Sequence, residues 1–161
     1  MDDKSFDAMV KANNLQVLYR GESGQEAADR FMNDELSHIG AGNYGSGYYF
    51  STRKSDAIGY AQSKSKFSGN GKLETMVLSP TARAIKHSDL VNLMSKASPK
   101  FLKALGIAGR SDNSGYTNAG EMQFAAKLGY NVIAVDSGWG NTYCFAIDRS
   151  AFIVRKSLET Y

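Results

Sequence analysis

The spacing of apolar residues changes along the chain from helical to strand-like, which predicts a mixture of helices and strands. From Phe6 to Leu15, apolar residues recur at helical spacing, and the pair Asn13-Asn14 marks the end of this helix. Gln16 to Arg20 has the side chains of a strand and leads into a glycine-containing turn. Further helices are predicted over 24–39, 54–61, 90–105 and 121–129, and further strands over 48–50, 73–78, 84–85, 131–135, 142–147 and 151–154.

The order of these elements favours an α+β fold. Strands dominate both ends of the chain and helices lie between them, which differs from the regular alternation of a parallel α/β fold. The length of 161 residues is close to that of one domain, so we expect a single domain over 1–161. The stretch 107–119, rich in Ser, Asp and Asn, predicts a long loop that is either functional or loosely ordered.

Composition narrows the classes of protein to consider. The net charge of +3 is mildly basic and well short of the dense Lys/Arg stripe of a dedicated nucleic-acid binder, so nucleic acid is not indicated as a partner. No apolar run approaches the length of a membrane span, and the amino terminus is not hydrophobic. We therefore expect a cytoplasmic protein without a membrane partner.

The chain has few cysteine and histidine side chains, which limits its capacity for disulfide formation, nucleophilic catalysis by cysteine and zinc binding. A single cysteine, Cys144, excludes an internal disulfide and lies in an apolar run, which favours a buried, inert thiol over a nucleophile. The two histidines, His38 and His87, are too few to assemble a zinc cluster with it. We expect no metal site.

The stretch from Ala41 to Ala61 is the clearest candidate for a ligand site. Its glycines, among them Gly45 and Gly47, let the backbone approach a ligand closely. The strand that follows carries Tyr49, and the predicted helix after it carries Tyr60. Two tyrosines on a strand and a neighbouring helix predict an aromatic slot.

Arg20 is a second candidate, because it stands at the end of a predicted strand beside Gly21. A guanidinium there suits phosphate oxygens or ribose hydroxyls, since it offers a planar fork of donors and a permanent charge. The alternative is a surface arginine that forms a salt bridge with Glu22 or Asp29.

Two motifs resemble the nicotinamide-binding core of the ADP-ribosyltransferase superfamily. Gly45-Ser-Gly-Tyr-Tyr-Phe50, followed by Tyr60, resembles the glycine-flanked strand and helical tyrosine of the diphtheria-toxin and poly(ADP-ribose) polymerase branch. Leu18-Tyr-Arg-Gly-Glu-Ser23 is similar to the first core strand of the cholera-toxin-like branch, in which Arg precedes Gly. The resemblance implies an ADP-ribosyltransferase-like split antiparallel sheet with peripheral helices.

The same resemblance implies roles for individual residues. Tyr49 and Tyr60 would stack on the two faces of the nicotinamide ring of NAD, and Arg20 would hold the dinucleotide. The Gly21 backbone would bind the carboxamide with Ser55, although the usual serine position is occupied by Ala57. The full expected NAD-binding set is Arg20, Gly21, Ser23, Gly47, Tyr49, Ser51, Ser55 and Tyr60.

The catalytic acid is the weakest part of the resemblance. Many members carry a glutamate on the closing strands, where this chain has Thr142 and Tyr143. The segment Gly120 to Tyr130 is similar to the carboxy-terminal part of small phage and bacterial mono-ADP-ribosyltransferases, including an anti-CRISPR type, and makes Glu121 the first candidate and Asp136 the second. The alternative is that Glu121 only favours the start of a helix through the helix dipole.

Together these features predict an NAD-dependent mono-ADP-ribosyltransferase in which Arg20, Tyr49 and Glu121 are catalytic. Its target would be a macromolecule, with a protein as the first candidate, in a toxin, effector or anti-defence setting. Two alternatives stay open: an inactive module that binds NAD or ADP-ribose, and a non-enzymatic inhibitor that acts by binding a partner.

Overall fold

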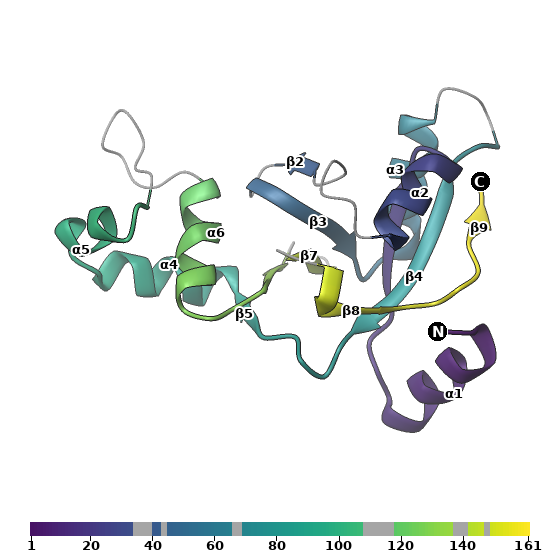
Figure 1. The fold of residues 1–161 in the computed structure, drawn as a ribbon, viewed down its shortest axis with the longest axis horizontal. Coiled ribbons are helices and arrows are strands. Elements are labelled where there is room, and N and C mark those ends of the chain that lie inside the picture. Colours follow the sequence, from purple (N-terminus) through teal and green to yellow (C-terminus); the bar gives the residue numbers. More distant parts are fainter. Residues whose placement is uncertain (34–39, 43–44, 66–68, 108–117, 137–141, 147–148) are drawn as a thin grey trace.

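The computed structural model of the protein describes residues 1–33, 40–42, 45–65, 69–107, 118–136, 142–146 and 149–161. One sheet of nine strands runs through the molecule, with helices on both of its faces, so the fold is α+β (Figure 1). The helices are α1 (Asp3–Asn13), α2 (Gln25–Met32), α3 (Lys54–Lys64), α4 (His87–Lys96), α5 (Pro99–Ala104) and α6 (Asn118–Lys127). The strands are β1 (Leu18–Glu22), β2 (Gly40–Gly42), β3 (Gly45–Ser51), β4 (Lys72–Leu78), β5 (Ala84–Lys86), β6 (Val132–Asp136), β7 (Thr142–Ala146), β8 (Phe152–Val154) and β9 (Glu159–Thr160).

The main path of the sheet has the strand order β5-β6-β7-β3-β1-β4-β8, with β2 paired to β3 and β9 paired to β4. Every pair is antiparallel except β5 with β6, which is parallel. Parallel strands need a long connection between them, and here the chain passes through α4, α5 and α6 between β5 and β6. The expected antiparallel sheet therefore has one parallel edge.

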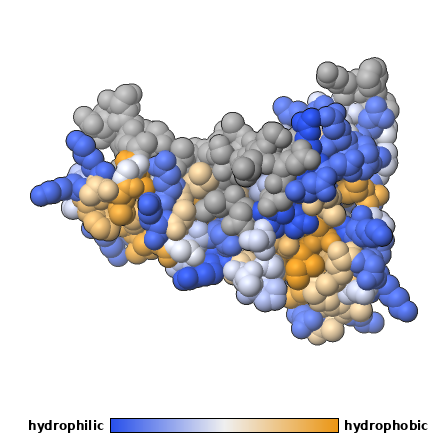
Figure 2. All heavy atoms as spheres, viewed as in Figure 1, coloured by the Kyte–Doolittle hydropathy of each residue, from blue (hydrophilic) through white to orange (hydrophobic). Residues whose placement is uncertain are grey.

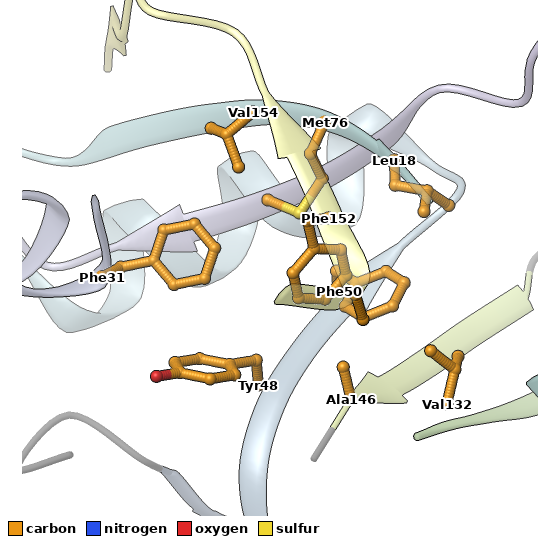
Figure 3. Packing of buried hydrophobic residues seen from close by; sticks show 10 residues of the cluster. Leu18, Phe31, Tyr48, Phe50, Met76, Val132, Ala146, Phe152 and Val154 are labelled. Atoms are coloured by element: carbon orange, nitrogen blue, oxygen red, sulfur yellow. The ribbon is translucent and has the colours of Figure 1, made fainter. Parts of the chain in front are cut away.

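A core of aromatic and aliphatic side chains fills one face of the sheet beneath α2 (Figure 3). Phe31 from α2 meets the ring of Tyr48 edge-on at 5.2 Å between centroids, and Phe50 meets Phe152 edge-on at 4.6 Å. Such edge-to-face pairs add roughly 1 kcal/mol each to the burial of the rings. The buried members of this cluster are Leu18, Phe31, Tyr48, Phe50, Met76, Val132, Ala146, Ala151, Phe152 and Val154.

A second core lies on the opposite face, beneath α4, α5 and α6. Its buried residues include Leu90 of α4, Phe124 of α6 and Ile133 of β6, and Tyr49 packs against it. Figure 1 shows these three helices together at one end of the molecule, whereas α1, α2 and α3 gather at the other. In Figure 2 the surface over α2 and α3 is mainly hydrophilic, and apolar residues gather over the end that holds α4 and α5.

Most predicted elements are confirmed, with shifted ends. The predicted helix 54–61 is α3, extended to Lys64, and the first strand begins two residues later than expected, at Leu18. The predicted helix 90–105 is two helices, because Pro99 begins α5 and the Ser98 side chain caps it by accepting a hydrogen bond from the Phe101 amide. The loop predicted over 107–119 falls largely outside the described residues. Among the described residues, no helix is both long and apolar enough to cross a bilayer.

Helix α3 lies directly against β1 at Gly21. A Cβ at this position would lie 2.1 Å from the backbone oxygen of Ala57 and 2.8 Å from the amide nitrogen of Ala61, both on α3. Backbone atoms cannot move aside as a flexible side chain can, so only glycine permits this contact. Gly21 thus sets the distance between α3 and the sheet.

We predict that Gly21→Ala lowers the free energy of unfolding by about 2 kcal/mol or more, the usual cost of forcing an extra group into a packed core. Gly59→Ala is the matched control. Gly59 is an exposed glycine of α3, the helix that packs on Gly21, and a Cβ added to it meets nothing within 4 Å. Removing a glycine from a helix interior should stabilise the protein by about 1 kcal/mol. Urea denaturation of both variants measures the difference, and equal stabilities would contradict this packing.

Candidate functional site

The ladder between β1 and β3 is short, and we call the stretch beyond its described pair the opening between these strands. Strand β1 pairs with β4 along its whole length, from Leu18 to Glu22, but the described pairing between β1 and β3 is limited to Tyr19 opposite Ser51. If that antiparallel register continued, Gly21 would stand opposite Tyr49. The strand directions thus bring the backbones of two residues that the sequence assigns to the site towards each other beyond the single described pair.

Arg20 bridges the two strands at this opening. Its Nη1 donates a 2.9 Å hydrogen bond to the backbone oxygen of Tyr49, and its Nε lies 2.5 Å from Glu22 Oε1. The side chain is only 10% exposed, and its guanidinium carbon lies 5.2 Å from the centre of the Phe31 ring. The salt bridge with Glu22, which was the alternative role for Arg20, is present but buried rather than at the surface, and the guanidinium lies on the α2 side of the sheet.

Glu74 completes a buried group of charges beside Arg20. It stands directly opposite Arg20 on β4 and is fully buried, and among the described residues neither of its carboxyl oxygens has a hydrogen-bond partner. Burial raises the pKa of Glu74 well above its usual value, and the negative charge of Glu22 adds to the effect. The guanidinium groups of Arg20 and Arg149 act in the opposite direction but do not cancel it.

The face of the sheet that carries Tyr49 lies opposite this buried charge. Tyr19 and Gly21 share a face of β1, and the register with β3 places Ser51, and with it Tyr49, on that same face. Helix α3 covers this face at Gly21, and α6 contributes to the core against which Tyr49 packs. Both helices contact β3, on the face that carries Tyr49.

Glu121 lies in the first turn of α6, on the side of the helix that faces the sheet. It precedes the buried Phe124 and Ala125 by three and four positions, so all three share one helix face. Its side chain is 14% exposed, and its Oε2 lies 2.7 Å from Nε2 of His87. A carboxylate near the start of a helix also benefits from the positive end of the helix dipole.

The structure brings some of the predicted residues together. Gly21, Tyr49 and Ser51 lie at the opening, and Ser51 is buried, where its Oγ accepts a hydrogen bond from the Arg53 amide. Tyr60 is 54% exposed on α3, with the Lys64 ammonium 5.7 Å from its ring centre. The opening is thus flanked by one tyrosine on the strand and by a helix that bears the other.

Other predicted residues lie apart from the opening. Ser55 is exposed, and it precedes the buried Ala57 by two residues, about 200° around the helix, so it is turned away from the sheet. Ser23 is exposed beyond the end of β1, and Gly47 pairs with Gly40 in the hairpin of β2 and β3. Asp136 ends β6 one residue after Val135, and since Val135 packs on the Tyr49 side, Asp136 belongs to the opposite face.

The resemblance implies that the two closing strands form a hairpin, but they do not pair with each other: β7 lies between β3 and β6, whereas β8 pairs with β4. Tyr143 of β7 stands opposite Ser51 of β3, and Thr142 stands opposite Asp136 of β6. The carboxylate of Glu121 on α6 is thus the candidate acid that the structure places on the Tyr49 side.

Sequence reasoning did not find the roles of His87 and Glu74. His87 contacts Glu121 across 34 positions of the chain, and no local pattern signals such a contact. For Glu74 a signal existed, since it is the one charged residue in the strand predicted over 73–78. A charged residue within a buried strand indicates a specific electrostatic role or a strained position.

A separate pocket of about 420 Å³ lies where α1 approaches the sheet, lined by Phe6, Val10, Tyr19, Lys54, Glu159 and neighbouring residues. None of the predicted NAD-binding residues lines it. Its polar groups are engaged with one another, because the Lys54 ammonium bonds both carboxylate oxygens of Glu159 at 2.9 and 2.7 Å. The pocket is therefore distinct from the opening between β1 and β3.

Comparison of the sequence with protein-family models and with curated proteins gives no match.

We predict that Glu74→Gln stabilises the protein increasingly as the pH rises from about 4.5 towards 7. The unfolded chain releases the Glu74 proton near its usual pKa of 4.5, whereas the folded protein retains it to a higher pH. The stability that the wild-type protein has at low pH is therefore lost as the pH rises from the unfolded pKa through the raised folded pKa. Glutamine has the same shape and does not titrate. Chemical denaturation of both proteins at several pH values tests this, and a stability difference that does not change with pH would contradict the buried neutral carboxyl.

Proposed function

We propose that the protein is an NAD-dependent mono-ADP-ribosyltransferase that binds nicotinamide where β1 and β3 separate. The observation that carries this proposal is the short ladder between β1 and β3, whose register, if it continued, would set Gly21 opposite Tyr49, with the Glu121 carboxylate on the same side of the sheet. The order Arg20-Gly21, Tyr49 and Tyr60 along the chain, which resembles the superfamily, supports the same conclusion.

The opening offers the contacts that nicotinamide requires. Its ring is a flat cation in NAD, so the face of a tyrosine binds it by stacking and by cation-π attraction. The backbone of a strand whose neighbour has diverged can supply hydrogen-bonding groups to a carboxamide. Tyr49 and Gly21 provide these two kinds of contact, and Tyr60 is exposed on the neighbouring helix.

Cleavage of the nicotinamide bond builds positive charge on the ribose. The bonding electron pair leaves with the nicotinamide, which becomes neutral, and the ribose C1 acquires oxocarbenium character. A carboxylate held nearby stabilises this charge in the transition state more than in the substrate. Glu121 takes this role, and a nucleophilic atom of the acceptor then bonds to C1 and gives its proton to solvent.

Arg20 serves the site in a different way from a phosphate clamp. Its guanidinium is engaged by Glu22 and by the Tyr49 carbonyl, so its role in this proposal is to hold β1 and β3 at a fixed separation. The dinucleotide phosphates then lie elsewhere along the opening. The acceptor is a macromolecule, with a protein as the first candidate, which fits a toxin, an effector or an anti-defence protein.

We predict that Glu121→Gln slows nicotinamide release from NAD by about 100-fold or more, the usual effect of losing one electrostatic group at a transition state. Glu26→Gln is the matched control, because Glu26 lies in the first turn of α2 with a largely exposed side chain. The measurement is release of labelled nicotinamide with and without a cell lysate as acceptor. Wild-type protein that binds NAD but never releases nicotinamide would contradict transfer and leave a binding module.

We predict that Tyr60→Ala weakens NAD binding about 10-fold, since stacking of an aromatic side chain on a base contributes roughly 1–3 kcal/mol. Because Tyr60 is largely exposed, this variant should keep its stability. Phe101→Ala, which removes an equally exposed ring from α5, is the control and should bind as wild type does. Titration calorimetry with NAD compares the three proteins, and equal affinities would argue against a nicotinamide slot beside α3.

A further inference from the structure

The contact between His87 and Glu121 joins two helices at the edge of the proposed site. His87 begins α4 directly after β5, three positions before the buried Leu90, so it lies on the inner side of its helix. Glu121 lies in the first turn of α6, also on the inner side of its helix. The two helices contact each other, and the 2.7 Å distance between Nε2 and Oε2 is that of a strong hydrogen bond.

The chemistry of this contact defines its direction. An ionised carboxylate only accepts hydrogen bonds, so Nε2 of His87 carries the proton and donates it. Both side chains are largely shielded, with exposed fractions of 27% for His87 and 14% for Glu121. A buried hydrogen bond of this kind holds the carboxylate in one orientation.

The two oxygens of the Glu121 carboxylate differ. Oε2 is held by His87, whereas Oε1 makes no hydrogen bond within the part of the chain that the structure describes. A carboxylate with one oxygen fixed and the other open is suited to accept a hydroxyl hydrogen bond from a ligand. The sugar hydroxyls of the nicotinamide ribose are donors of this kind.

We propose that His87 is a positioning residue for the transfer reaction: it fixes Oε2 of Glu121 and thereby presents Oε1 to the nicotinamide ribose. This inference rests on the proposed function. Without the imidazole, the carboxylate rotates and its open oxygen leaves the position where charge develops on the ribose. Misplacement of a catalytic group by about 1 Å costs on the order of 100-fold in rate.

The kinetic test compares His87→Ala with His87→Gln. The alanine variant should lower kcat for nicotinamide release about 100-fold with KM for NAD unchanged, because NAD contacts Glu121 and not His87. The glutamine variant should recover most of this loss, since its side-chain amide places a donor close to the position of Nε2. If the contact only joined α4 to α6, His87→Ala would lower the stability of the protein. It would not lower kcat at an unchanged KM, and His87→Gln would not restore kcat.

A second measurement uses protein with an unaltered His87. Long-range ¹H–¹⁵N spectra at a pH where imidazole is neutral should show His87 protonated on Nε2, with the proton shifted downfield by the short bond. Glu121→Gln should remove that shift and leave the signals of the other histidine, His38, unchanged. This readout needs no NAD and no catalysis.

The outcomes separate the two proposals. If wild-type protein never releases nicotinamide, the proposed function fails and this inference fails with it. If it does release nicotinamide, and His87→Ala is as fast as wild type or His87→Gln is as slow as His87→Ala, only the inference is overturned. Spectra in which Glu121→Gln leaves the His87 signals unchanged also overturn it.

Discussion

The hydrogen bond from Arg20 to the backbone oxygen of Tyr49 is the contact on which the site depends. It joins β1 to β3 just where their ladder, described only at Tyr19 and Ser51, gives way to an opening. A side chain thus replaces a backbone pair, and the strands stay close without closing. The same bond directs the charged group to the α2 side and leaves the Tyr49 ring on the opposite side, where α3 and α6 flank it.

The cost of burying that arginine shapes the surrounding core. A guanidinium that is 10% exposed needs partners, and Arg20 has Glu22, the Tyr49 carbonyl and the rings of Phe31 and Tyr48. Phe31 lies between two cations, because the guanidinium carbon of Arg149 is 5.1 Å from the centre of its ring. This arrangement ties α2 to the sheet, so the position of Arg20 between β1 and β3 also depends on the packing of Phe31.

The sequence predicted the elements of the site better than their orientation. The strand that bears Tyr49 and the helix of Tyr60 are confirmed, because the aromatic content of the strand and the residues that favour the start of a helix are local signals. Arg20 was expected to reach a phosphate, although alternation along the strand already places it on the face opposite Gly21. Ser55 was expected to contact the carboxamide, yet helical periodicity already turns it away from the sheet, because Ala57, two residues later, faces the sheet. The partnership of His87 with Glu121 comes from the packing of α4 on α6, which no local pattern encodes.

Because we propose that nicotinamide binds at the opening between β1 and β3, a crystal structure with NAD is the most direct test. We expect the nicotinamide ring against Tyr49, its carboxamide at the Gly21 backbone, and Glu121 as the carboxylate nearest to the ribose. Nicotinamide bound elsewhere, for example in the pocket beside α1, or another acid against the ribose would contradict the assignment.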